Sequence, residues 1–153
     1  MRKFILSFAI LAFTLGAKAQ DTKLSVGASI GFPTTSGMSF AYGADLQADF
    51  GVAESAAITA SAGYLNYSWK GGGNSGFIPL LAGGKFGFGE SGMYGHAQIG
   101  YGFASRGGGG AFAYAPSLGY NVSDNLDLAL KYLAFSKNGF TNGSVNLRVA
   151  YKF

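Results

Sequence analysis

The sequence contains no cysteine, a single histidine and few charged side chains, which make up 12% of its 153 residues. Without cysteine the chain forms no disulfide, uses no thiol chemistry and carries no lipid anchor on an N-terminal cysteine. One histidine and no cysteine cannot supply the usual ligands of a zinc site, so we expect neither a metal nor a cofactor. Instead, the chain has 26 glycines and 16% aromatic residues, which is unusual for one soluble domain of this length.

The N-terminus has the features of an export signal. Arg2 and Lys3 precede an apolar run from Phe4 to about Ala17, and the residues Ala17-Lys18-Ala19 form a cleavage site. We expect residues 1–19 to be removed as a signal peptide and residues 20–153, beginning with Gln20, to form one domain. The apolar run is shorter than the roughly 20 residues of a transmembrane helix, and no later segment approaches that length.

Removal of the signal changes the charge of the chain. Arg2, Lys3 and Lys18 leave with it, so 11 basic residues become 8 against 7 acidic ones, a net charge near +1 (8 − 7). The basic character of the full sequence therefore belongs to the export signal. The composition gives no support to a nucleic-acid or polyanion partner.

Apolar residues alternate with small or polar ones along the whole mature chain, which is the period of strands with two unlike faces. In the last ten residues the apolar row is Val145, Leu147, Val149, Tyr151 and Phe153, and the other row is Asn146, Arg148, Ala150 and Lys152. The pattern predicts eight strands of about ten residues, each long enough to cross a membrane when tilted. The predicted connections are 33–37, 51–54, 68–76, 89–92, 104–109, 121–125 and 136–143. The tighter turns, 51–54, 89–92 and 121–125, alternate with the other connections, which are longer except for 33–37. We expect this second set to face outside.

The contents of the two rows distinguish a membrane barrel from a soluble one. Of the 21 aromatic residues in the mature chain, 15 lie on the row that we assign to the outside, and all 15 charged residues avoid that row. An eight-stranded interior is only just wide enough for ordinary side chains, so 15 aromatic residues would overfill it. The small and charged row fits a narrow lumen better. A secreted soluble β-barrel that binds a small apolar ligand remains the alternative.

The terminal strand, with Tyr151 and Phe153 on its apolar face, resembles the C-terminal strand of bacterial outer-membrane β-barrels. Over residues 21–153 the chain is similar to small barrels of the OmpX and OmpA-transmembrane type. The resemblance implies an all-β fold, an eight-stranded antiparallel up-and-down transmembrane β-barrel in the outer membrane. It also implies contact with outer-membrane lipids, and makes Tyr151 and Phe153 part of the signal read by the barrel assembly machinery. We expect a monomer.

Two glycine-rich segments are better explained by turns than by nucleotide binding. Residues Gly87 to Gly92 match G-x-G-x-x-G, but a dinucleotide site needs a helix to follow, whereas residues 93–96 alternate as a strand. Residues 107–110 lack the Lys-Ser/Thr of a phosphate-binding loop. We interpret the first segment as a hairpin turn and the second as a loop tip.

The inner row carries the candidate functional residues. They are Lys23, Asp45, Asp49, Lys85, His96, Asp127, Lys131, Arg148 and Lys152. Counting outward from the predicted turns places four pairs opposite each other: Lys23 with Asp49, Lys85 with His96, Asp127 with Lys152, and Lys131 with Arg148. A ladder of ion pairs of this kind would satisfy the buried charges and block the lumen.

These features favour a non-enzymatic outer-membrane barrel with a structural, interaction or limited-permeability role. Eight strands give a diameter far below that of a general porin. The alternative is a lipid-modifying barrel enzyme of the acyltransferase or deacylase type, in which His96 would be the base. The predicted neighbour of His96 is Lys85, unlike the carboxylate that orients a catalytic imidazole, so we assign no catalytic residue.

Overall fold

The computed structural model describes residues 22–153, which are almost entirely β-strand. The predicted signal peptide, residues 1–19, and the predicted first mature residue, Gln20, lie outside the described residues. The strands are β1 (Thr22–Pro33), β2 (Met38–Ala53), β3 (Ala56–Trp69), β4 (Asn74–Gly87), β5 (Met93–Ala104), β6 (Gly110–Asn121), β7 (Leu126–Lys137) and β8 (Phe140–Lys152). A short 3-10 helix, η1 (Gly89–Ser91), precedes β5.

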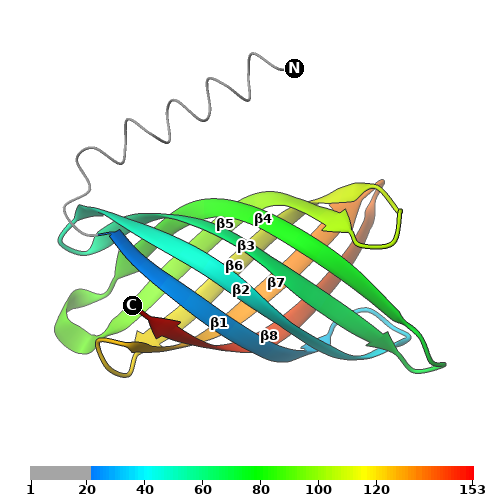
Figure 1. Cartoon of the computed structure of the whole chain (residues 1–153), viewed down its shortest axis with the longest axis horizontal. Coiled ribbons are helices and arrows are strands. Elements are labelled where there is room, and N and C mark those ends of the chain that lie inside the picture. The colour runs from blue at the N-terminus through cyan, green and yellow to red at the C-terminus, as the bar shows by residue number, and fades with distance from the viewer. Residues whose placement is uncertain (1–21) are drawn as a thin grey trace, which may run out of the picture.

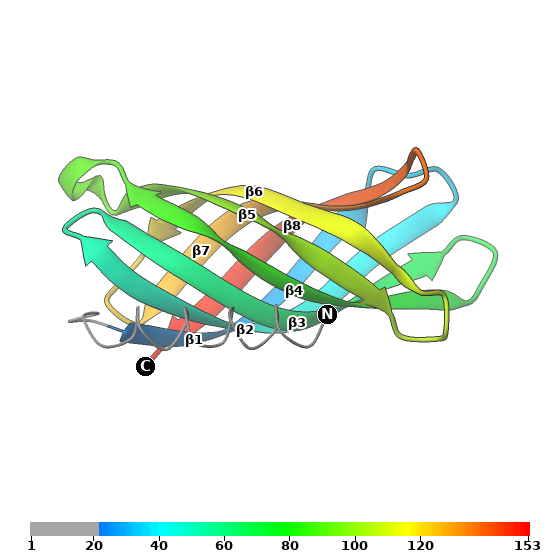
Figure 2. The same cartoon turned by 90° about the horizontal axis from the view of Figure 1, so that it is seen from above.

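Each strand pairs antiparallel with the next, and β8 pairs with β1, so that the sheet closes into a barrel (Figures 1 and 2). The closing ladder runs from Ser25 opposite Lys152 to Pro33 opposite Ser144. Closure leaves no free strand edge, which is the condition for placing a sheet in hydrocarbon. The predicted eight-stranded up-and-down barrel is confirmed.

The two ends of the barrel carry different connections. The near end holds the start of β1, the C-terminus and the connections at 54–55, 88–92 and 122–125, on the left of Figure 1. The far end holds the connections at 34–37, 70–73, 105–109 and 138–139. Two-residue turns and five-residue loops occur at both ends, so the predicted contrast between tight turns and longer outer loops is wrong. The flanking Gly, Asn and Ser residues join the ladders instead, because pairing satisfies their backbone groups.

The connection between β7 and β8 differs most from the prediction. A loop was expected at 136–143, but Asn138 and Gly139 alone make the turn, with φ angles of 52° and 82°. Two successive residues with positive φ, Asn followed by Gly, are typical of a type I′ hairpin turn. The shorter turn moves the register of this hairpin by two residues.

The two faces of the strands separate as predicted. Large apolar side chains cover the outside, where Leu46 is 64% exposed and Ile99 is 61% exposed, whereas the neighbouring inner residue Gln98 is 2% exposed. An apolar surface that continues around the molecule is far larger than the patches tolerated on soluble monomers. This surface fits the hydrocarbon core of a membrane.

Candidate functional site in the barrel lumen

The lumen is divided into a polar half and an apolar half. Charged and amide side chains, most of them from β2, β4, β5, β7 and β8, fill the polar half, next to the near end, and include Asp49, Gln98 and Asp127. Apolar side chains fill the half next to the far end, including Leu65 and Phe135. The sequence predicted the polar half only.

The strongest contact in the polar half joins Arg148 of β8 to Asp45 of β2. Arg148 donates from Nε to Oδ1 at 2.9 Å and from Nη2 to Oδ2 at 2.6 Å. This is a bidentate, charge-assisted pair, which is the most directional contact available to a buried carboxylate. Arg148 is 4% exposed, and the pair spans the intervening strand β1.

Asp127 of β7 is the second centre of charge, and it is 2% exposed. Its Oδ1 accepts a hydrogen bond from the Tyr94 hydroxyl at 2.7 Å and lies 3.6 Å from Nη1 of Arg148. Its Oδ2 has no hydrogen-bond partner but faces two ammonium groups, those of Lys85 at 3.6 Å and Lys152 at 3.9 Å. Three cations from two strands, β4 and β8, thus surround one buried carboxylate.

Lys85 links this centre to the remaining carboxylate. Its Nζ lies 3.2 Å from Oδ2 of Asp49 and 3.9 Å from the centre of the Tyr94 ring, a cation–π contact. Gln47 donates from Nε2 to Oδ1 of Asp49 at 2.6 Å. All three lumenal carboxylates therefore have a cationic partner, as buried charges require.

His96 and Lys131 belong to a neighbouring chain of hydrogen bonds that includes no carboxylate. Lys131 donates to Oε1 of Gln98 at 3.1 Å, Gln98 donates to Ser61 at 3.0 Å, and Nε2 of His96 lies 2.8 Å from Oγ1 of Thr59. Among residues 22–153 His96 has no hydrogen bond or ion pair to a carboxylate. Thr59 is completely buried, so this hydroxyl is not accessible to a lipid substrate.

The structure places all of the candidate residues except Lys23 in the lumen, but only two of the four predicted cross-strand pairs have the predicted register. The registers place Lys23 opposite Asp49 and Lys85 opposite His96, as predicted, but the Lys23 side chain is exposed. Lys85 forms its ion pairs with carboxylates of other strands.

The two predicted pairs of the last hairpin are wrong. Asp127 lies opposite Ala150 and Lys131 opposite Asn146, because the β7–β8 turn is shorter than expected. Asp127 still approaches Lys152 at 3.9 Å, whereas Arg148 pairs with Asp45 on the other side of β1.

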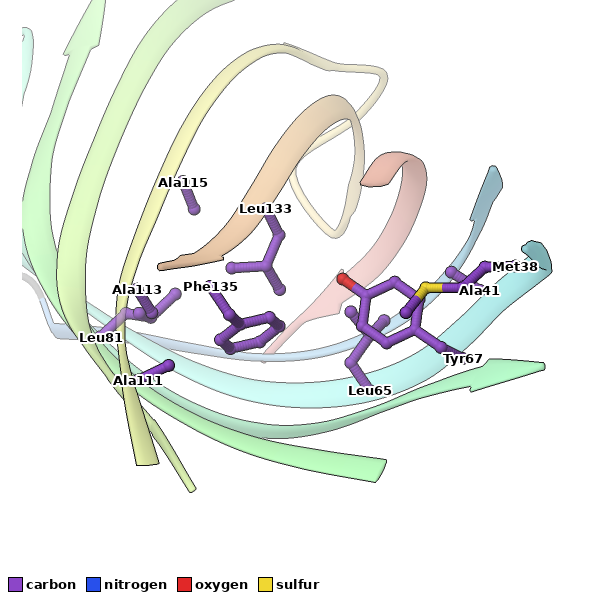
Figure 3. Close-up of a cluster of buried hydrophobic side chains, with 10 residues drawn as sticks. All are labelled: Met38, Ala41, Leu65, Tyr67, Leu81, Ala111, Ala113, Ala115, Leu133 and Phe135. Atoms are coloured by element: carbon purple, nitrogen blue, oxygen red, sulfur yellow. The ribbon is translucent and has the colours of Figure 1, made fainter. Parts of the chain in front are cut away.

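The apolar half contains an aromatic cluster that the sequence reasoning did not identify. The rings of Phe77 and Phe135 stack with centres 4.6 Å apart, and Tyr67 meets Phe135 edge to face at 6.4 Å. Figure 3 shows Tyr67 and Phe135 projecting into the barrel beside Leu65 and Leu133. A signal was present, since these aromatic positions have the parity of the inner row.

Neither the lumen nor the rest of residues 22–153 holds a group of His, Cys, Asp and Glu side chains arranged to bind a metal ion. Within the same residues no helix is long and apolar enough to cross a membrane.

Solved structures resemble the chain over most of its length. Ail, the attachment invasion locus protein of Yersinia pestis, matches with 16% identity and a TM-score of 0.62, over 86% of this chain and 97% of that one. The N-terminal barrel domain of Pseudomonas aeruginosa OprF matches with 13% identity and a TM-score of 0.64 over the same shares. Neisserial surface protein A matches with 15% identity and a TM-score of 0.54, again over 86% and 97%.

The fold is that of the small bacterial outer-membrane β-barrels. No protein-family model and no curated protein sequence matches the chain. At 13–16% identity the similarity shows the fold alone. These outer-membrane neighbours and the apolar outer surface both support the predicted location in the bacterial outer membrane.

Proposed function

We propose that the protein is a non-enzymatic integral barrel of the outer membrane, with a structural or interaction role and a lumen closed to general solutes. The observation that carries this proposal is the filling of the lumen by two different layers. Ion pairs cross the polar half, and stacked aromatic rings fill the apolar half. A general porin has many more strands and a water-filled channel.

The charges of the polar half favour a structural role over a transport role. Asp45, Asp49 and Asp127 each lie within 4 Å of a cation, so every carboxylate of the layer is paired with an opposite charge. A passing ion would have to separate these pairs in a poorly solvated interior, which is costly. Any permeability would therefore be limited to water or to rare small solutes.

The proposed partners of the protein contact the outer, apolar face of the barrel. Outer-membrane lipids would contact the exposed apolar row, and the barrel assembly machinery would recognise Tyr151 and Phe153 at the near end. That end would face the periplasm. We also propose that the barrel is a monomer, because closure leaves no strand edge for a second copy to extend.

Expression of the full chain with its signal in a Gram-negative host tests the location and the fold together. We expect the protein in the outer-membrane fraction, with N-terminal sequencing starting at Gln20 and with electrophoretic migration that changes on heating. Light scattering of the detergent-solubilised protein should give the mass of one chain. Recovery as a soluble periplasmic monomer would contradict the proposal.

The lipid-modifying alternative depends on His96 and is tested there. His96→Ala should leave the host's lipid A and phospholipid profiles identical to those of cells with the unaltered protein, measured by mass spectrometry. A modified lipid that appears with the unaltered protein and disappears with His96→Ala would establish the enzyme instead.

A further inference from the structure

A pocket of about 460 Å³ opens at the far end of the barrel, beside the aromatic cluster. It lies between the β5–β6 loop and the β7–β8 turn, whose tips are at the same end of the barrel in Figure 2. Its volume is within the range of roughly 300–1,000 Å³ that is common for small-molecule sites. The proposed structural role of the protein does not use this pocket.

The pocket combines an aromatic surface with a wall of bare backbone. Phe77, which is only partly buried, is stacked on Phe135 and contributes an apolar surface. Residues 108–110 are glycines that also line the pocket. A Cβ atom added at Gly109 would lie 3.1 Å from Nζ of Lys137, so the glycine keeps the approach to this ammonium group open.

Lys137 supplies the charge of the pocket. Its Nζ donates to the Gly108 carbonyl at 3.2 Å, and within the described part of the chain it forms no salt bridge. An ammonium group has three donors, so donors remain for a ligand. Asn142 adds a side-chain amide to the lining.

The charges around the pocket have one sign. The far-end connections and strand ends of residues 22–153 carry Lys70, Arg106 and Lys137 and no Asp or Glu, whereas Glu54, Glu90 and Asp124 all lie at the near end. A positive field at the mouth attracts anions and repels cations. An occupant of this pocket should therefore be anionic.

We propose that the far-end pocket binds a small aromatic carboxylate. The carboxylate would accept hydrogen bonds from Lys137, and the ring would pack on Phe77, where aromatic contacts are favourable beyond the area they bury. The glycine wall leaves room for a flat ring between the loop and the turn.

The probe is 2-naphthoate, titrated by isothermal calorimetry into the full barrel in phosphatidylcholine nanodiscs, with empty nanodiscs as the blank. We expect saturable binding to one site. Lys137→Gln should weaken it about tenfold, the loss typical of a hydrogen bond to a charged group. Ala111→Leu, which fills the pocket, should also weaken it, and the neutral 2-naphthalenemethanol should bind more weakly than the acid.

Lys70→Gln is the matched control, because it removes a cation from the same end outside the pocket lining. It should leave the affinity within twofold of the unaltered protein. Equal losses for Lys70→Gln and Lys137→Gln would show general charge attraction and overturn the site. The proposal also fails if binding to the loaded and empty nanodiscs is the same, or if Lys137→Gln and Ala111→Leu both bind normally. Heat-dependent migration on a gel verifies that each variant is folded.

Discussion

Arg148 reaches Asp45 across a strand that has no side chain in the way. The pair spans β1, where Gly27 lies opposite both Asp45 and Ala150. A Cβ atom at Gly27 would come within 2.7 Å of Nε of Arg148. The small residues of the inner row therefore have a second role besides fitting a narrow lumen. Gly27 leaves the space through which the Arg148 guanidinium group reaches Asp45.

Removal of one partner of this pair should cost more than removal of both. Arg148→Met leaves Asp45 buried without its main cation and should lower the free energy of unfolding by about 3 kcal/mol or more. Asp45→Leu combined with Arg148→Met should recover at least half of that loss, since no uncompensated Asp45 charge remains. Urea unfolding in detergent, followed by gel migration, measures both. A single variant as stable as the unaltered protein would contradict the assigned role of the pair.

The β7–β8 hairpin sets the position of half of the polar layer. Asn138 and Gly139 turn the chain in two residues, and this turn determines which residue of β8 lies opposite Asp127 and Lys131. Since side chains alternate between faces, a slip of one residue in this hairpin would send Arg148 to the lipid.

Gly139→Val tests the turn. A β-branched residue at φ of 82° is strained, and we expect a loss of about 1–2 kcal/mol in unfolding free energy. Gly71→Val is the control, since Gly71 lies in an exposed loop, lacks a positive φ and has nothing within 4 Å of a built Cβ. The two variants are compared by their urea midpoints. Equal midpoints would show that the turn is not strained.

The last strand closes the barrel and ends on an exposed ring. Phe153 is 74% exposed, its backbone N–H donates to the Leu24 carbonyl at 2.9 Å, and its ring meets Tyr151 edge to face at 5.3 Å. The closing hydrogen bond needs only the backbone of Phe153. A requirement for its ring in assembly would therefore reflect recognition or contact with lipid.

Phe153→Asp should leave secretion intact and reduce the amount inserted into the outer membrane several-fold. Phe140→Asp is a matched control, because Phe140 begins the same strand at the far end and is 81% exposed. Immunoblots of periplasmic and outer-membrane fractions measure the distribution of each variant. Unchanged outer-membrane yield of Phe153→Asp would refute the role of the terminus.

At the scale of the whole molecule, two unlike layers lie one after the other along the lumen. Under the proposed function, the ionic layer would exclude solutes by its charge pairing and the aromatic layer would exclude them by packing. Removal of one layer should leave the other as a barrier. The protein is thus expected to tolerate single lumenal substitutions without becoming a channel.

Planar-bilayer recording tests this arrangement. The unaltered barrel should show at most rare, small steps, and Phe135→Ala and Arg148→Ala should each increase them only slightly. The double variant should increase step frequency more than the sum of the single ones, because each layer alone still blocks the path. Large, stable steps from the unaltered protein would contradict a closed lumen.

Alternation along the sequence was sufficient to predict the barrel. Leu147 and Val149 are apolar and suit lipid, whereas Asn146 and Arg148 are polar and suit the lumen. A strand places such neighbours on opposite faces. Closure then followed from the need to pair every backbone group in hydrocarbon. The strand number, the two faces and the closure do not depend on which distant side chains meet, which is why all three were predicted correctly.

Only the tertiary structure determined which lumenal residues meet. Arg148 meets Asp45 across β1, and Tyr94 meets Asp127 across β6, because barrel tilt and the registers of the intervening strands bring these residues to the same height. The far-end pocket around Phe77 depends on the same long-range placement. The sequence determined which side chains face inward, because strand alternation is a local property. Which of these side chains meet depends on the pairing register of every strand that lies between them in the closed sheet.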